Sequence, residues 1–166
     1  HTGNNPVRDA GILWNVTYKR RKWIKESEWP KIKESARNSL DRLVLYLGAM
    51  MGLRRAEMVR IKLSDIKNGE IKVKGKGHGP EGKVDYLPMP KEVERALQDY
   101  LRDRDKINTQ SDKLLIRIDG RTVGKEIDER GIRYIIDNIG KRAGVDFSPH
   151  SLRRLFATVA YQHTDI

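Results

Sequence analysis

His150 and Arg153 are the pair of side chains in this sequence best suited to binding an anion. They lie three residues apart in a predicted helix, so both side chains fall on one face of it. The helix is predicted to begin at Pro149, with Ser148 as its N-cap. A helix N-terminus carries free N–H groups and partial positive charge, and an arginine can bind phosphate through two parallel hydrogen bonds. The pattern indicates a phosphate site, although a surface histidine and arginine on a capped helix would give the same spacing.

Arg54 and Arg55 form a second basic pair, directly after a predicted helix break at Gly52. Glu57 follows Arg54 by three residues and could hold its guanidinium in an ion pair. An arginine oriented at the start of a helix again suits an anion. A solvated helix start is the alternative explanation for this pair.

Lys76 stands between Gly75 and Gly77, where a mobile lysine could deliver a proton or a positive charge. A solubilising lysine in a turn is the alternative. The same stretch nearly matches a nucleotide-binding loop from Gly77 to Lys83, but Val84 stands where a serine or threonine would bind Mg²⁺. The residues after Lys83 also have the pattern of a strand, whereas such a loop requires a helix, so we do not expect a nucleotide site.

The elements that must position these residues are mostly helical. Apolar residues at helical spacing predict helices over 40–51, 54–61, 90–101, 132–139 and 149–160. Alternating residues predict a hairpin with strands around 71–73 and 84–86, and the run 114–118 is a possible third strand. Because the strands do not alternate with helices, the predicted fold class is α+β, a mostly helical domain with a small antiparallel β-sheet.

Local signals refine these elements. Asn68-Gly69 predicts a turn, and Gly144 is placed to cap a helix C-terminus. Pro90 suits the first position of its helix. The last helix is expected to bury a stripe made of Leu152, Leu155, Phe156, Val159 and Ala160.

Composition favours a polyanionic partner. The 166 residues include 34 Lys+Arg against 23 Asp+Glu, for a net charge of +11. A basic run, Lys19-Arg20-Arg21-Lys22, lies within residues 1–30, which we expect to form an arm on a single domain. No apolar run is long enough to span a membrane, so no membrane partner is expected. Cysteine is absent and the four histidines are scattered, so we expect neither a disulfide nor a metal site.

Three ordered motifs together resemble the tyrosine recombinase (integrase) family. The run Met51-Gly52-Leu53-Arg54-Arg55-Ala56-Glu57, followed by Leu63-Ser64-Asp65-Ile66, resembles the first arginine box of that family. Gly75-Lys76-Gly77 matches its β-hairpin lysine. Arg142-Ala143-Gly144, followed by Pro149-His150-Ser151-Leu152-Arg153-Arg154-Leu155-Phe156-Ala157-Thr158, resembles the second box. The resemblance covers about residues 36–160 and implies the catalytic domain, a mostly helical fold around a small antiparallel sheet.

The resemblance implies site-specific recombination of double-stranded DNA by protomers joined in a synapse, with no metal or cofactor. Arg54 and Arg153 would clamp the scissile phosphate, and Lys76 would protonate the 5′-oxygen. His150 would assist proton transfer with a tyrosine that becomes bonded to the 3′-phosphate. We expect a cytoplasmic, nucleoid-associated protein with further DNA contacts from Lys19, Arg20, Arg21, Lys22, Arg55, Lys74 and Arg154.

The sequence departs from the family pattern in two places. Arg154 stands where the family often has a second histidine. The nucleophilic tyrosine of the family would lie beyond Ile166, since Tyr161 comes too early, and the N-terminal DNA-clamping domain is missing. We therefore expect a catalytic domain cut short before its tyrosine. A DNA-binding module without cleavage activity is the alternative, and a basic RNA-binding protein of ribosomal type would leave the His150 and Arg153 pair unexplained.

Overall fold

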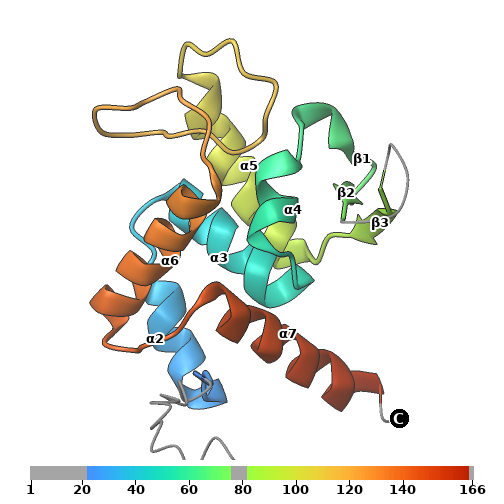
Figure 1. Ribbon diagram of the computed structural model, residues 1–166, viewed down its shortest axis with the longest axis vertical. Helices are drawn as coiled ribbons and strands as arrows, with labels where there is room; N and C mark the ends of the chain where they lie inside the picture. The colour runs from blue at the N-terminus through green and yellow to red at the C-terminus, as the bar shows by residue number, and fades with distance from the viewer. Residues whose placement is uncertain (1–21, 76–81, 165–166) are drawn as a thin grey trace, which may run out of the picture.

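The five predicted helices and the hairpin are all present in the fold (Figure 1). The computed structural model describes residues 22–75 and 82–164. In chain order its elements are η1 (Glu26–Glu28), α2 (Trp29–Glu34), α3 (Ser39–Met51), α4 (Arg55–Arg60), η2 (Leu63–Asp65), β1 (Ile66–Lys67), β2 (Glu70–Lys74), β3 (Val84–Pro88), α5 (Lys91–Asp105), α6 (Glu129–Ala143) and α7 (Pro149–Thr164). The predicted fold class, α+β with a small antiparallel sheet, is confirmed.

The sheet has the strand order β1-β2-β3, and both pairings are antiparallel. Asn68 and Gly69 turn the chain between β1 and β2, with φ angles of 53° and 75° in the left-handed region, so the predicted turn is confirmed. Ile71 and Val73 of β2 are buried, and Ile71 pairs with Leu87 of β3. β2 also packs against α4, so the hairpin lies beside that helix.

The third strand predicted at 114–118 is wrong. Within this stretch Ile116 makes an isolated bridge with Glu126, the preceding Lys113 makes another with Lys62, and the third strand of the sheet is β1. The run is apolar because it is buried, and burial alone does not distinguish a strand from an irregular segment.

Two side chains of α5 form hydrogen bonds with backbone groups in and next to that buried stretch. The Tyr100 hydroxyl donates to the carbonyl oxygen of Leu114 at 2.7 Å and accepts from the Ile116 N–H at 2.9 Å. The Arg104 guanidinium donates to the carbonyl oxygens of Leu114 at 3.1 Å and Lys113 at 2.7 Å. Burial raises the pKa of Tyr100 to about 12, so its hydroxyl stays neutral and keeps both bonds.

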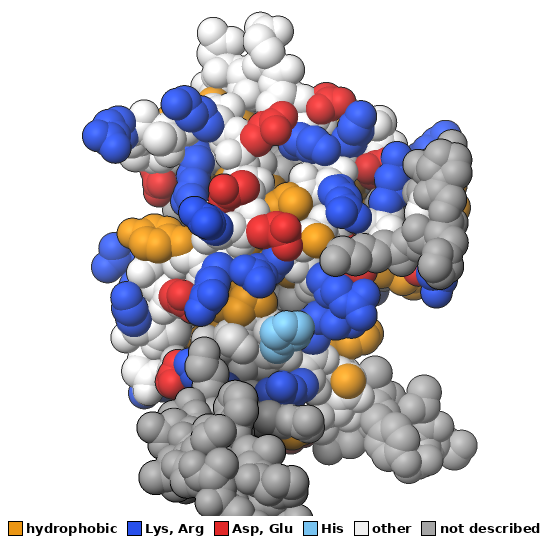
Figure 2. Space-filling model, viewed as in Figure 1, with side chains coloured by type: hydrophobic (Ala, Val, Ile, Leu, Met, Phe, Trp, Pro, Cys, Tyr) orange, Lys and Arg blue, Asp and Glu red, His pale blue; other side chains and the backbone are white. Residues whose placement is uncertain are grey.

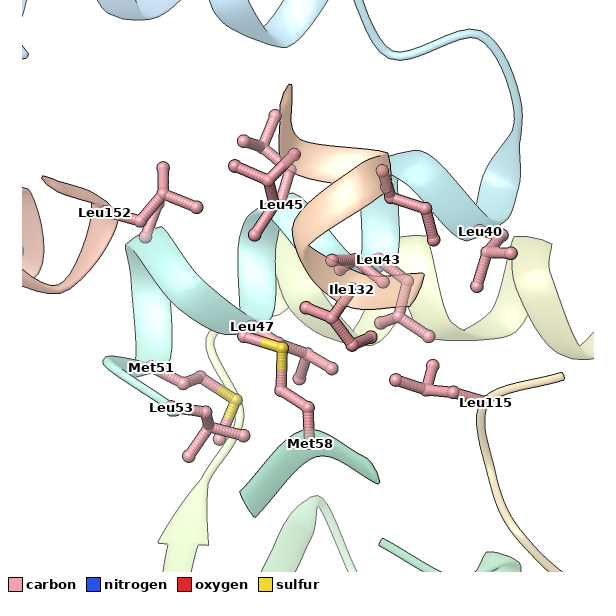
Figure 3. Close-up of a cluster of buried hydrophobic side chains, with 14 of the residues drawn as sticks. Leu40, Leu43, Leu45, Leu47, Met51, Leu53, Met58, Leu115, Ile132 and Leu152 are labelled. Carbon is pink, nitrogen blue, oxygen red and sulfur yellow. The ribbon is translucent and has the colours of Figure 1, made fainter. Parts of the chain in front are cut away.

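The hydrophobic core gathers around α3, which packs against α5, α6 and α7. Figure 3 shows side chains of α3, α4, α6 and α7 meeting there, among them Leu43, Leu47, Met58, Ile132 and Leu152. Gly48 permits the close approach of α7, because a Cβ at this position would lie 3.0 Å from Leu152 Cδ1. The position of α7, which carries His150, therefore depends on the surface of α3.

Three helical details differ from the predictions. α2 was not predicted, because it has six residues and buries only Ile32, too little for a periodic stripe. Pro90 is the N-cap of α5 and not its first residue. Leu152 and Leu155 are buried as expected, but Val159 is 38% exposed because α7 extends away from the body of the domain (Figure 1). Among the described helices, none combines the length and the apolar character that crossing a membrane requires.

Candidate functional site

Three of the four residues predicted to act on a phosphate line one pocket. Arg54, His150 and Arg153 surround a hollow of about 270 Å³ between the starts of α4, α6 and α7. Figure 2 shows a face on which many Lys and Arg side chains gather around a histidine. The lining as a whole has four arginines against two glutamates, so the pocket carries a net positive charge suited to an anion.

Arg153 is held in place by the backbone at the end of α3. Its Nε donates to the Gly52 carbonyl oxygen at 2.9 Å. A guanidinium has five N–H donors, so this bond orients the group and leaves its terminal nitrogens available to a ligand. The predicted cap is also present, since Ser148 Oγ accepts from the Ser151 N–H at 3.3 Å at the start of α7.

Gly52 is required at its position for two reasons. It ends α3 in the left-handed conformation, with φ of 67°, as the predicted helix break suggested. A Cβ there would also lie 2.5 Å from Cδ1 of Phe156, whose ring rests on the glycine. Phe156 and Arg153 are therefore both fitted to Gly52, which fixes α7 relative to the end of α3.

Arg54 is oriented by Glu57, as its spacing suggested. The backbone N–H of Arg54 donates to Glu57 Oε2 at 2.8 Å. In the side chain, Arg54 Nη1 lies 3.5 Å from Glu57 Oε1. The Glu57 side chain is 14% exposed and that of Arg54 is 58% exposed. The largely buried Glu57 carboxylate thus pairs with an accessible Arg54 guanidinium in the lining of the pocket.

The hairpin brings Gly75 next to the same carboxylate. A Cβ on Gly75 would lie 3.7 Å from Glu57 Oε1, and the Gly75 N–H donates to the Lys83 carbonyl oxygen at 2.8 Å, which closes the described end of the hairpin. Lys76, the fourth predicted residue, lies outside the described residues, but its neighbour Gly75 is at the Arg54–Glu57 pair.

Two lining residues were missed by the sequence analysis. Arg60, the last residue of α4, and Glu129, the first residue of α6, both line the pocket. Arg60 follows Glu57 by three residues on a helix, a spacing that could have placed it on the same face. Nothing local to Glu129 indicated that α6 begins at this pocket.

The residues predicted to contact DNA fall into three groups. Lys19, Arg20 and Arg21 lie outside the described residues. Arg55 lines the pocket, and Lys74 is exposed at the end of β2. Lys22 and Arg154 contact one another, because Arg154 Nη1 donates to the Lys22 carbonyl oxygen at 3.0 Å, and the Lys22 ammonium binds Asp146 at 2.7 Å.

No tyrosine is among the described residues that line the pocket. Tyr161 lies within α7, eight residues after Arg153. At a helical rise of 1.5 Å per residue, it is ~12 Å further along the helix axis than Arg153.

Comparison with known proteins finds a curated relative that is similar over most of this chain. Tyrosine recombinase XerC of Staphylococcus saprophyticus is 35% identical over 139 residues, which are 80% of this chain and 44% of XerC. The chain thus spans less than half of the length of that relative.

Two solved structures share the fold. XerA recombinase superposes with a TM-score of 0.74 at 27% identity, over 87% of this chain and 52% of that chain. The lambda integrase catalytic core superposes with a TM-score of 0.66 over 86% of this chain and 85% of that core, at 18% identity. Residues 22–165 match the phage integrase family. The chain therefore belongs to the phage integrase family of tyrosine recombinases.

Proposed function

We propose that this chain binds a DNA phosphodiester in the pocket between α4, α6 and α7, as the catalytic domain of a protein that performs site-specific recombination. The observation that carries the proposal is that Arg54, His150 and Arg153, far apart in sequence, line one pocket with a net positive charge. Family membership supports the same reaction. In the whole protein a tyrosine hydroxyl attacks the phosphorus, the P–O5′ bond breaks, and a 3′-phosphotyrosine bond forms.

The two arginines stabilise the charge that develops on the phosphate. Arg54 and Arg153 donate to the non-bridging oxygens, and both guanidinium groups have a partner before DNA arrives, Arg54 the Glu57 carboxylate and Arg153 the Gly52 carbonyl oxygen. Such preorganised donors act where the charge forms, and removing one typically costs about 10²–10³ in rate.

His150 and Lys76 complete the proton transfers. His150 takes the proton of the tyrosine hydroxyl, and Lys76 gives a proton to the departing 5′-oxygen, so the numbers of protons taken and given balance. His150 lines the pocket, and the described end of the hairpin next to Lys76 lies at the Arg54–Glu57 pair. The proposal assigns no metal or cofactor to the site.

The proposed partners are double-stranded DNA and further protomers, in a cytoplasmic, nucleoid-associated protein. Structural relatives support this: XerH recombinase has been solved bound to its difH substrate, and lambda integrase as a tetramer bound to a Holliday junction. Exposed Lys74 and pocket-lining Arg55 are proposed to contact the backbone beside the scissile phosphate.

Titration of a duplex oligonucleotide tests the proposed site. Binding should weaken steeply between ~50 and ~200 mM salt, because phosphate contacts release counterions. Arg153→Ala should weaken binding at least about tenfold, an amount typical of losing a charge-assisted bidentate contact. Arg102→Ala is the matched control, since Arg102 is 72% exposed on α5, is ion-paired with Asp99 and lines a different hollow.

Equal losses in Arg153→Ala and Arg102→Ala would mean that binding follows net charge and not the pocket, and would overturn the proposed site. An affinity that does not change across the salt range would equally contradict backbone binding.

A further inference from the structure

The segment that leads into the first helix lies against the start of α7, where one arginine contacts it. Arg154 Nη1 donates to the Lys22 carbonyl oxygen at 3.0 Å, and its guanidinium carbon lies 5.3 Å from the centre of the Trp23 ring. A planar guanidinium can stack on an aromatic ring while it donates hydrogen bonds, an arrangement that a lysine ammonium does not reproduce. Residues 22–24 are called the lead-in segment below.

Lys22 ties the lead-in segment to a second point. Its ammonium binds Asp146 Oδ1 at 2.7 Å, and Asp146 comes two residues before Ser148, the cap of α7. Ile24, at the other end of the segment, is buried in the core. The segment therefore contacts both the α6–α7 loop and the second turn of α7.

We infer that Arg154 and Trp23 form a latch that fixes the first turns of α7 and thereby the directions of Arg153 and His150. Arg153 is bonded to Gly52 at the end of α3, and the next residue, Arg154, is bonded to the lead-in segment. Two adjacent residues of α7 are thus bonded to two different parts of the chain, the end of α3 and the lead-in segment. The inference rests on the proposed phosphate site, and it makes Arg154 a positioning residue and not a DNA contact.

The contacts of the latch are exposed, which sets the size of the expected effects. Trp23 is 59% exposed, and the Lys22 and Asp146 side chains are 47% and 79% exposed. Exposed ionic contacts add little to global stability because water and salt screen them. Loss of the latch should therefore loosen the start of α7 locally and leave the melting temperature of the domain almost unchanged.

Amide hydrogen exchange on the 166-residue chain reads out this local order. The Ser151 and Leu152 N–H groups donate to the Ser148 carbonyl oxygen at 2.9 Å and 3.3 Å, so their exchange reports the first turn of α7. Trp23→Ala and Arg154→Ala should each speed this exchange several-fold, and Trp23→Phe, which keeps an aromatic face, should have a smaller effect. A circular-dichroism melt of each variant checks that it is folded.

Lys33→Ala is the matched control for the exchange experiment. Lys33 Nζ lies 5.9 Å from the centre of the Trp29 ring, a cation–aromatic contact of the same kind outside the latch. Its loss should not change exchange at the start of α7.

Duplex binding separates positioning from direct contact. Removing an arginine that touches a phosphate lowers the slope of log K against log salt by about 0.9. We expect Arg154→Ala and Trp23→Ala, which removes no charge, to weaken binding to a similar extent, several-fold, without changing that slope.

Two results would overturn the latch. Unchanged exchange at Ser151 and Leu152 in both alanine variants would show that the contact holds only the lead-in segment. A lower salt slope in Arg154→Ala, with normal affinity in Trp23→Ala, would show that Arg154 contacts DNA directly. The exchange result does not depend on DNA, so it decides the latch even if Arg153→Ala leaves binding intact and the proposed site itself fails.

Discussion

Arg153 on α7 donates its Nε proton to the carbonyl oxygen of Gly52, 101 residues earlier, over 2.9 Å. The same glycine ends α3 in the left-handed conformation and supports the ring of Phe156. The end of one helix thereby sets both the position of α7 and the orientation of an arginine in the pocket. A change at Gly52 should therefore affect stability and phosphate binding together.

Gly52→Ala should destabilise the domain more than an alanine at another left-handed glycine. Gly120 is the control, because its φ is 76° and nothing lies within 4 Å of a Cβ built there. Gly120→Ala should cost only the left-handed backbone penalty, about 1–2 kcal/mol. Gly52→Ala adds the clash with Phe156, and overpacking of this kind typically costs a further 1–3 kcal/mol or so. Urea unfolding of both variants measures the difference, and equal losses would mean that the Phe156 contact is unimportant.

Tyr100→Phe should lower the free energy of unfolding by about 1–3 kcal/mol at neutral pH, because it leaves the Ile116 N–H buried without its acceptor. The carbonyl oxygen of Leu114 keeps its bond from Arg104, which limits the loss. Denaturant unfolding measures the change. Tyr46→Phe is the control, since the Tyr46 hydroxyl makes no hydrogen bond to another described residue and its pKa is raised mainly by burial.

The pH dependence of stability provides a separate test of the buried hydroxyl. The pKa of Tyr100 is raised by burial from 10.0 to about 12, so the folded state favours the neutral form. The stability that comes from this preference is fully present below pH 10 and is lost as the pH rises towards 12. The difference in unfolding free energy between the wild type and Tyr100→Phe should therefore shrink over that window. A difference that stays constant up to pH 12 would contradict the raised pKa.

The ion pair between Arg142 of α6 and Asp41 of α3 should contribute more than any exposed pair on α6. Arg142 Nη2 lies 2.7 Å from Asp41 Oδ2, and the two side chains are 24% and 12% exposed. Arg142→Met should cost about 2 kcal/mol, the typical value of a hydrogen bond to a charged group. Arg133→Met removes a pair at 3.8 Å whose side chains are 66% and 44% exposed, and should cost less than about 0.5 kcal/mol. Thermal unfolding of the two variants compares them directly.

The helices could be predicted because each buries a stripe at helical spacing. The Ile132, Ile135, Ile136 and Ile139 stripe of α6 is buried throughout, and Gly144 ends that helix with φ of 67°, as predicted. The irregular stretch 114–118 could not be predicted, because its backbone bonds are divided between the Tyr100 and Arg104 side chains of α5 and scattered backbone groups in other loops. Sequence spacing contains no signal for partners of that kind.

The pocket was predictable only in part, for a similar reason. Arg54, His150 and Arg153 could be selected because each lies at a helix start within a motif. Glu129 joins them only because α6 begins at the pocket, which depends on the path of the whole 106–128 connection. The Arg154 contact with Trp23 likewise joins residues far apart in the sequence, so the sequence around either residue does not predict the contact.

Covalent adduct formation separates a cleaving domain from a module that only binds DNA. Attack on a phosphate requires the tyrosine oxygen within about 3.5 Å of phosphorus and in line with the leaving oxygen. Tyr161 lies within α7, ~12 Å beyond Arg153 along the helix axis, and no described residue lining the pocket is a tyrosine. The 166-residue chain should therefore form no covalent adduct with a nicked suicide duplex on a denaturing gel. A longer form that includes the downstream tyrosine implied by the family resemblance should form the adduct, and changing that tyrosine to phenylalanine should abolish it while DNA binding persists. A covalent band from the 166-residue chain that disappears in Tyr161→Phe would instead identify Tyr161 as the nucleophile, and would require α7 to unwind so that its hydroxyl could reach the pocket.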